Sequence, residues 1–437
     1  MASRVLIVGG GIAGLSAAIG LRRANVDVDV VEADRRWAVD DIGMIVHANF
    51  LKALSYLDLA DDAMALGVPC DEASIEDFDG NPLPQLSVEL ARQQQDVRLP
   101  PDVISPAEAN ELLATSDDSR GPPANSEPPP KSASADEPRQ FPGTLGISRR
   151  PLHKLLAGAV FSSGANVRLG VTFTEIVQSG NHAIVTLSDG SVTSYDLVIG
   201  ADGVHSKVRA AVFGTQFKPQ FTGQYRWRCM VRRPKGPDPS FVRIKDDGTF
   251  YGYLPISARL GCVMLMDREP VDPACPPRMR AQLVRARLAG CTGRLAELRE
   301  QIVDSAAVVC RPIETLFMPA PWYRGRVLLI GDASHSMTAH MAQGAVQAVE
   351  DGVVLSELFA RQATVSQVLE SFMLRRFARS KMIADSTLLV SSTDSSAGSA
   401  TSVARVTERM LALASTVALD DFPLSFGPLD RGKLAQK

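Results

Sequence analysis

Residues 5–21, VLIVGGGIAGLSAAIGL, together with the acid that ends the nearby run VVE at positions 30–32, decide the fold. The apolar run at 4–8 is typical of a buried parallel strand, and residues 12–24 have the character of a helix. Residues 28–31 form a second apolar strand ending at Glu32. Strand, helix and strand within such a short stretch predict a βαβ unit, and hence an α/β fold with a Rossmann-like domain.

The glycines of this stretch have the spacing of a dinucleotide-binding loop. Gly9 permits a tight turn, Gly11 lets a pyrophosphate approach the backbone, and Gly14 allows close helix packing. The helix start offers amide groups and a partial positive charge, and Glu32 can accept hydrogen bonds from an adenosine ribose. These residues do not distinguish FAD from NAD(P). The expected contacts in this region are Gly9, Gly11, Ile12, Ala13, Gly14, Glu32 and Ala33.

Composition narrows the class of protein. The chain has 437 residues, 45% of them hydrophobic and 22% charged, with a formal net charge of -3. This balance predicts a soluble protein without a strong positive field, so nucleic acid is not an expected partner. Six cysteines without a C-x-x-C pair indicate neither a zinc site nor a disulfide framework and favour the cytoplasm. No long uninterrupted apolar run predicts a membrane-spanning helix.

The length and the changes in composition along the chain predict two interleaved domains and a helical end. Residues 116–143 are rich in Pro, Ser, Asp and Glu, which predicts a flexible insertion, with a partner-binding segment as the alternative. Helical stretches are expected near 49–66 and 279–302, and antiparallel strands within 221–267. The predicted nucleotide-binding domain comprises residues 1–70, 144–215 and 318–365, the substrate domain 71–115 and 216–317, and the C-terminal helical region 366–437.

Two further motifs follow predicted buried strands. DLVIGADGVHSKVR occupies positions 196–209, and GRVLLIGDASHSMTAHMAQGAVQAVEDG occupies positions 325–352. With the glycine loop, these motifs resemble the FAD-dependent aromatic hydroxylases, the single-component flavoprotein monooxygenases that act on hydroxybenzoate, salicylate or hydroxynicotinate. The three motifs occur in the family's order between about residues 4 and 380. The resemblance implies a glutathione-reductase-type FAD domain with an inserted mixed or antiparallel substrate sheet.

The resemblance also implies roles for residues outside the glycine loop. Asp202 and Gly203 would lie near the pyrophosphate, with Arg209 supporting them, and Asp332 after Gly331 would bind the ribityl chain. A helix starting near Gln343 would direct its N-terminus at the flavin pyrimidine. Residues 42–46 would pass the isoalloxazine. The further FAD contacts expected on this basis are Arg35, Arg36, Arg149, Val171, Gly344 and Ala345.

Three histidines are candidates for chemistry or structure. His335 occupies the family's usual histidine position, where a structural role is expected. His340 would lie near the flavin ring and could contact substrate, and His47 could accept a proton from a phenol; a packed imidazole is the alternative for both. His335 and His340 lack a third ligand nearby, so we expect no metal site. In the substrate sheet, Tyr225 and Tyr253 are the first candidates for a pocket that binds a flat ring.

The resemblance implies an oxidoreductase in which NADH or NADPH reduces FAD. Reduced FAD would form a C4a-hydroperoxide with dioxygen and hydroxylate a small aromatic or heteroaromatic, phenolic substrate. A halogenase lacks support because the Trp-x-Trp-x-Ile-Pro signature is absent, and an NAD dehydrogenase leaves the second and third motifs unexplained. A non-hydroxylating flavoprotein subunit of the same fold remains the alternative. The expected assembly is a monomer or homodimer without membrane contact.

Overall fold

The structure is a computed structural model that describes residues 3–70, 74–77, 141–235, 240–245, 249–268, 276–361 and 364–392. The predicted insertion at 116–143, apart from its last three residues, lies outside the described residues. The same holds for the predicted segment 71–115 except 74–77, and for the C-terminal region after 392.

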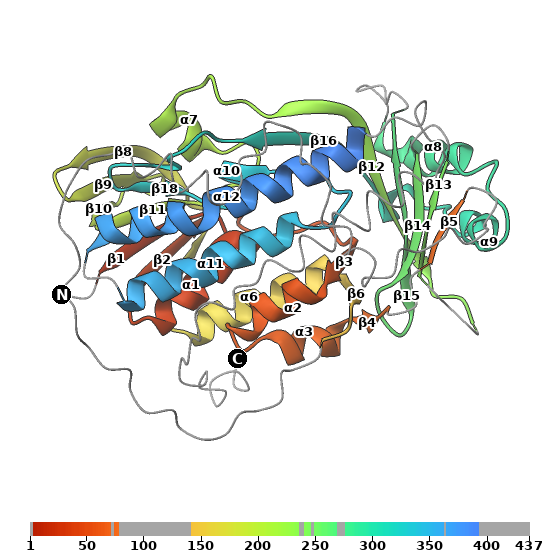
Figure 1. The fold of residues 1–437 in the computed structure, drawn as a ribbon, viewed down its shortest axis with the longest axis horizontal. Coiled ribbons are helices and arrows are strands. Elements are labelled where there is room, and N and C mark those ends of the chain that lie inside the picture. The colour runs from red at the N-terminus through yellow and green to blue at the C-terminus, as the bar shows by residue number, and fades with distance from the viewer. Residues whose placement is uncertain are drawn as a thin grey trace, which may run out of the picture.

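A six-stranded sheet forms the centre of the larger part of the molecule, and the βαβ unit lies in its middle (Figure 1). Its strand order is β17-β18-β11-β1-β2-β7, and all neighbours are parallel except β17 and β18. Residues 5–8 of β1 are at most 3% exposed, as expected for a strand covered on both faces. The strands are β1 Arg4–Val8, β2 Asp27–Glu32, β7 Asn166–Leu169, β11 Leu197–Gly200, β17 Tyr323–Arg324 and β18 Val327–Leu329.

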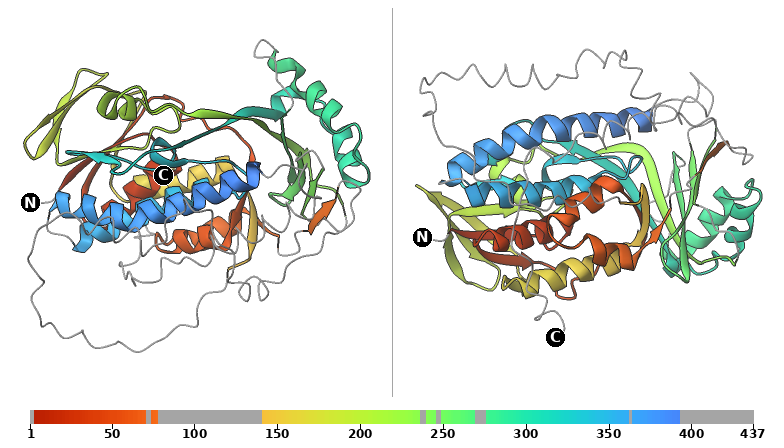
Figure 2. Two further views of the ribbon diagram at one scale, coloured as in Figure 1. Left: turned by 45° about the horizontal axis from the view of Figure 1, so that its top comes forward. Right: turned by 60° about the horizontal axis from the view of Figure 1, so that its bottom comes forward.

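Helices cover one face of this sheet and a small antiparallel sheet covers the other. Figure 2 shows α12, α11, α1 and α6 side by side in one layer. On the opposite face, Ala183, Val185 and Leu187 of β9 enter the same hydrophobic core. The elements of the two outer layers are α1 Ile12–Arg23, α6 Arg149–Ser162, α11 Gly344–Arg361, α12 Val365–Ser392, β8 Phe173–Ser179, β9 His182–Leu187 and β10 Val192–Tyr195.

A second six-stranded sheet lies at the other end of the molecule, with α8 and α9 on its outer side (Figure 1). Its order is β16-β12-β15-β14-β13-β5, and all pairs are antiparallel except β13 with β5. We call it the substrate sheet. Its elements are β5 Ser74–Asp77, β12 Gln220–Arg232, β13 Phe241–Ile244, β14 Phe250–Pro255, β15 Leu260–Asp267, β16 Val308–Phe317, α8 Arg280–Arg287 and α9 Arg294–Glu300, with 3-10 turns at Pro277–Met279 and Ser305–Ala307.

A three-stranded sheet of order β3-β6-β4 lies between the two large sheets, and short helices flank it. The sequence predicted one helical stretch over 49–66, but the chain forms two helices because Asp58, at φ 57°, turns it between them. The stretch 279–302 is likewise divided before Gly293, also at φ 57°. The remaining elements are β3 Gly43–His47, β4 Val68–Pro69, β6 Thr144–Ser148, α2 Ala48–Ser55, α3 Ala60–Leu66, α7 Lys207–Phe213 and α10 Asp332–His335.

Within the described ranges, none of the helices combines the length and apolar character needed to cross a membrane.

Helices α1 and α11 approach closely through small residues. Substitution of a glycine at this contact tests how tightly the two helices pack. A Cβ added at Gly352 would lie 2.6 Å from the backbone nitrogen of Ala17, whereas a Cβ at Gly158 of α6 would have no heavy atom within 4 Å. We expect Gly352→Ala to lower the free energy of unfolding by about 1–3 kcal/mol through overpacking. Gly158→Ala should raise it by about 0.5–1 kcal/mol through helix propensity. Urea unfolding of both variants checks this, and a stable Gly352→Ala protein would contradict the packing.

Candidate active site

The glycine loop follows β1 and opens α1, as predicted. Gly9 has φ 113°, and a Cβ there would lie 2.4 Å from the carbonyl oxygen of Ala201. A Cβ at Gly14 would lie 2.0 Å from the carbonyl oxygen of Gly9, so both positions require glycine. Gly11 has no heavy atom within 4 Å of where its Cβ would be, which leaves its outer side open. The first-turn amides of α1, at Ile12 and Ala13, lie beside that opening.

Glu32 lies beside this loop at the end of β2. Its carboxylate accepts hydrogen bonds from the backbone N–H of Gly10 and of Asp34, both at 2.8 Å. Its backbone oxygen accepts from the N–H of Val171 at 3.0 Å. Ala33, Arg35 and Arg36 follow on the exposed surface, and the Arg35 side chain lies over Gly170. The residues predicted for the adenosine end are therefore gathered at one edge of the sheet.

Two aromatic residues that the sequence analysis did not select support the glycine loop. Trp37 Nε1 donates to the carbonyl oxygen of Gly10 at 2.9 Å, and His153 Nε2 lies 3.0 Å from the same oxygen. The two rings meet edge to face with centroids 5.2 Å apart. No periodic pattern signals such contacts, because residues 37 and 153 are brought together only by the packing of α6.

The second motif forms the turn between β11 and α7. Asp202 accepts from Ser206 Oγ at 2.5 Å and from the backbone N–H of Lys207 at 2.7 Å, so its carboxylate caps the helix. Gly203 has φ 81°, a conformation that favours glycine. The 3%-exposed Arg209 donates to the carbonyl oxygens of Val204 at 2.7 Å and Ala333 at 2.9 Å. Arg209 thereby joins the second motif to the third.

The third motif turns from β18 into α10. Gly331 has φ 58°, and Asp332 is exposed without a hydrogen bond from any described side chain. His335, only 1% exposed, lies with its Nε2 2.7 Å from the Asp351 carboxylate. This contact fits the structural role expected for His335. Among the described residues, no group of three or more His, Cys, Asp or Glu side chains could hold a metal ion.

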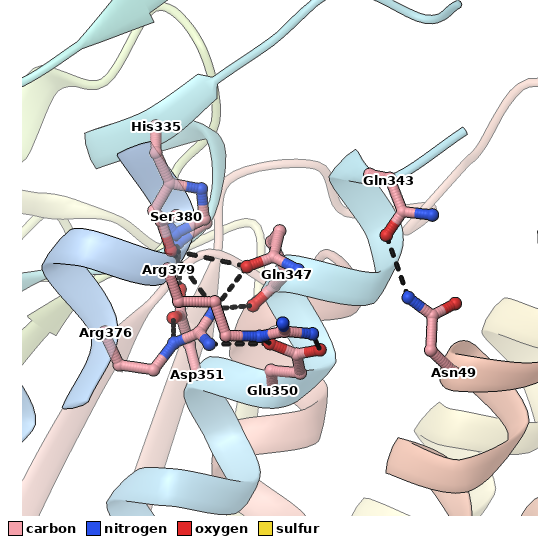
Figure 3. Close-up of polar contacts among 10 residues, drawn as sticks. Asn49, His335, Gln343, Gln347, Glu350, Asp351, Arg376, Arg379 and Ser380 are labelled. Atoms are coloured by element: carbon pink, nitrogen blue, oxygen red, sulfur yellow. Dashed lines mark hydrogen bonds and ion pairs between the residues drawn. The ribbon is translucent and has the colours of Figure 1, made fainter. Parts of the chain in front are cut away.

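The start of α11 lies next to α2 at the same side of the sheet. Asn49 Nδ2 donates to Gln343 Oε1 at 3.0 Å, a contact visible in Figure 3. The remaining amide atoms, Gln343 Nε2 and Asn49 Oδ1, are buried and have no hydrogen-bond partner among the residues that the structure describes. Gly344 and Ala345 form the first turn of α11. Burying polar atoms without hydrogen-bond partners costs free energy, so we expect another polar group to bind these two amide atoms.

Comparison with known proteins indicates the cofactor of this protein. Residues 2–387 match the model of a family described as FAD binding domain. The chain belongs to this FAD-binding family. It is 28% identical over 384 residues to 2-heptyl-3-hydroxy-4(1H)-quinolone synthase of Pseudomonas aeruginosa, covering 87% of this chain and 86% of that protein. It is 25% identical over 359 residues to the FAD-dependent urate hydroxylase of Mycolicibacterium vanbaalenii, covering 82% and 79%.

The fold is similar to that of Klebsiella pneumoniae HpxO, solved in complex with FAD and uric acid. The TM-score is 0.73 at 21% identity, over 94% of this chain and 97% of HpxO. The predicted fold class and the predicted cofactor class are thus confirmed. The residues of this chain fit an FAD: the open side of Gly11 suits a diphosphate, and the two amide atoms without a partner among the described residues, Asn49 Oδ1 and Gln343 Nε2, suit a polar ring edge.

The substrate sheet has two faces of different character, and alternation along its strands decides which residues face the FAD domain. Trp227, Tyr251 and Tyr253 lie in the core formed with α8 and α9. Tyr225 alternates with Arg226 and therefore shares the face of Trp227. This placement argues against a pocket role for Tyr225 and Tyr253, the two residues selected from the sequence.

The opposite face carries arginine, methionine and phenylalanine. Arg226 pairs across the sheet with Met266, and Met266 pairs with Phe250; Arg228 pairs with Met264. Met266 and Phe250 pack with Met341 of the third motif, which places this face against the FAD domain. The pocket candidates selected from the sequence, Tyr225 and Tyr253, did not include the arginines or the methionines. The stretch RWR at 226–228 contained a signal for the arginines, because charged residues alternate there with an apolar one.

Arg226 and Arg228 are largely buried, and within the described ranges neither forms an ion pair with a carboxylate. Burial, followed by the charge of Arg228, lowers the pKa of Arg226 to about 10, while the negative charge of Asp332 opposes that shift. Burial also lowers the pKa of Arg228. Arg311 beside them, in contrast, is paired with Asp40 at 3.0 Å. The face therefore presents positive charge that suits an anionic group.

His340 lies on the same side, with its ring 5.1 Å from that of Phe250. Both of its ring nitrogens are buried and lack partners among the described residues. Burial, and then the charges of Arg268 and Arg228, lower the pKa of His340 to about 4. His47 is different: its Nδ1 lies 3.4 Å from Thr144 Oγ1, and its ring has backbone hydrogen bonds with Gly143 and Met341. Burial lowers the pKa of His47 to about 4 as well.

These shifts predict a dependence of stability on pH. The ordinary pKa of 6.5 applies in the unfolded chain, while His340 in the folded chain has a pKa of about 4. Between these values the unfolded chain binds more protons, so stability is fully present above about pH 6.5 and decreases as the pH falls toward about 4. We expect His340→Gln to lose less stability than the parent protein between about pH 7.5 and about pH 5. Urea unfolding of the FAD-saturated proteins measures this, and equal losses would contradict the burial of His340.

Proposed function

We propose that this protein is an FAD-dependent monooxygenase that uses NADH or NADPH and dioxygen to hydroxylate a small, ring-containing, phenolic substrate. The observation that carries the proposal is the side of the substrate sheet that faces the FAD domain, where Arg226 and Arg228 lie. Among the described residues, neither arginine pairs with a carboxylate, and both ring nitrogens of the nearby His340 lack hydrogen-bond partners. The quinolone synthase and urate hydroxylase among the relatives, by their names, act on heteroaromatic compounds, which supports a heteroaromatic or aromatic ring here.

The three motifs would hold FAD along one edge of the parallel sheet. The amides at Gly11–Ala13 and the turn at Asp202-Gly203 would receive the diphosphate, with Glu32 at the adenosine ribose. Asp332 would bind the ribityl chain, and the start of α11 at Gly344 would face the flavin pyrimidine. Arg149, whose positive charge acts on both His153 and Arg226, would lie near the anionic cofactor. Bound FAD, once reduced, supplies the chemistry that activates dioxygen.

The side chains of the pocket would prepare the substrate for oxygen transfer. His340 is neutral at pH 7 because its pKa is about 4, so the one ring nitrogen that carries no hydrogen can accept a hydrogen bond from a phenol. Arg228 would stabilise negative charge on the phenol oxygen, which makes the ring richer in electrons. Met264, Met266 and Phe250 would exclude water from the ring. His47 is engaged by hydrogen bonds, and we therefore place the acceptor of the hydrogen bond from the phenol at His340.

The proposed FAD site is tested by removing the ribityl ligand. Asp332→Ala should lose bound flavin, because the variant lacks the only carboxylate proposed for that chain of hydroxyl groups. The matched control is Asp27→Ala, which removes an acid that is 67% exposed at the opposite edge of the same sheet. Flavin content is measured from the visible spectrum of the purified proteins. Unchanged occupancy in Asp332→Ala would refute the placement of this residue.

The proposed reaction is tested by following NAD(P)H consumption and hydroxylated product with a panel of phenols and heteroaromatic alcohols. We expect at least one compound to stimulate NAD(P)H oxidation with product formation. Arg228→Met should raise KM for that compound about tenfold or more, since a buried charged hydrogen bond is worth about 1.5–3 kcal/mol. Arg232→Met, an exposed arginine at the end of the same strand, is the control. FAD binding without turnover of any compound would favour a non-hydroxylating flavoprotein.

A further inference from the structure

A buried network of charged and polar residues joins the last two helices. Arg376 and Arg379 of α12 meet Glu350 and Asp351 of α11, as Figure 3 shows. Arg376 donates from Nε to Asp351 Oδ1 at 2.7 Å and from Nη1 to Glu350 Oε2 at 2.6 Å. Its Nη2 lies 2.8 Å from Gln347 Oε1. Arg376, Glu350 and Asp351 are at most 1% exposed. Every nitrogen of the Arg376 guanidinium therefore has a partner.

One member of this network, Asp351, also contacts the Gly331–His335 turn at the start of α10. Asp351 Oδ2 accepts the backbone N–H of Gly331 at 2.8 Å and lies 2.7 Å from His335 Nε2. The motif is thus held at both ends of α10, on either side of Asp332. Oδ2 of Asp351 contacts Gly331 and His335, while Oδ1 accepts from Arg376. The guanidinium therefore fixes the rotation of the Asp351 carboxylate that holds this turn.

Stability alone does not explain such a network. Buried ion pairs incur a large desolvation cost, and apolar residues of similar size are often equally stabilising. Burial acts to raise the pKa of Asp351, but His335 and Arg376 hold it below its ordinary value. Without Arg376, the Asp351 carboxylate would be a buried acid with less positive charge beside it. Its contacts with Gly331 and His335 would then weaken. The loop of positive φ at Gly331 would then lose its fixed amide direction.

We propose that Arg376 is a positioning residue for the flavin, and that it acts through Asp351 to orient the Gly331–His335 turn and its Asp332 carboxylate. Helix α12 contributes no residue to the three sequence motifs, yet it would determine the affinity of the site for FAD. The inference rests on the proposed role of Asp332 at the ribityl chain. It assigns α12 a function in cofactor binding in addition to its packing on α11.

The test is a double-mutant cycle on FAD affinity, measured by titrating apoprotein with FAD and following flavin fluorescence. Arg376→Met and Asp351→Asn are each expected to raise the Kd for FAD about tenfold. If Arg376 acts through Asp351, the double variant should bind FAD about as well as either single variant. Arg376→Lys keeps a positive charge beside Asp351 and should recover part of the affinity.

The matched control is Arg375→Met, which removes another α11–α12 ion pair, Arg375 with Glu357 at 2.7 Å, without contact to the motif. We expect it to lower the melting temperature of the apoprotein while the Kd for FAD stays unchanged. If Arg376→Met does not fold, Arg376→Lys with and without Asp351→Asn completes the same cycle.

Different outcomes separate the two proposals. If the increases in Kd of the two single variants multiply in the double variant, the inference is overturned, because Arg376 would then act independently of Asp351. Single variants that melt earlier but bind FAD with the parent Kd would also overturn it, since the network would only support packing. Both results leave the proposed monooxygenase intact. A parent protein that binds no FAD would instead overturn the proposed function.

Discussion

The structure depends on one constraint of parallel sheets: neighbouring strands end at the same edge. Strands β1, β11 and β18 are adjacent, and Val8 pairs with Gly200, which in turn pairs with Leu329. The turns that follow are bonded to one another, since the N–H of Ala201 donates to the oxygen of Val8 and the N–H of Ile330 to that of Gly200. Three motifs far apart in the chain therefore meet at one edge of the sheet, which is the usual ligand position in such sheets.

The substrate sheet completes this edge through the difference between its two faces. One face buries aromatic residues against α8 and α9 and stabilises the sheet. The other presents Arg226 and Arg228 toward the FAD domain, where the negative charge of Asp332 acts on Arg226. A diphosphate cofactor and a phenolate would supply negative charge on that side. The low pKa of His340 follows from its burial and from the charges of Arg268 and Arg228, so its neutral state and Arg228 belong to one electrostatic arrangement.

The helix layer contributes in a less direct way. Helix α11 begins at the flavin side of the site and carries Asp351 two turns further along. Helix α12 packs outside α11 and bears the arginines that balance the two buried acids. The ion pairs between α11 and α12 are thus connected, through the Asp351 carboxylate, to the amide of Gly331 and the imidazole of His335. This connection explains why Arg376, which lies outside every recognised motif, can influence the site.

The sequence by itself determined the βαβ unit, the fold class and the three motifs, because each depends on a few neighbouring residues. Gly14 is required by a close contact with the carbonyl oxygen of Gly9 in the same turn, and the acid Glu32 ends the adjoining strand. The helical stretch 49–66 was predicted as a whole, but its division at Asp58 was not, since a left-handed residue other than glycine gives little local signal.

Only the tertiary structure decided which face of the substrate sheet meets the cofactor domain. Alternation showed that Tyr225 and Arg226 face opposite ways, but not which of them faces inward, and the tyrosines were selected for their chemistry. The packing of α8 and α9 settles the question, because those helices cover the tyrosine face. The Arg376 network and the contacts of Trp37 and His153 with Gly10 likewise join residues distant in sequence. Such contacts arise from how the helices pack, and no local pattern encodes them.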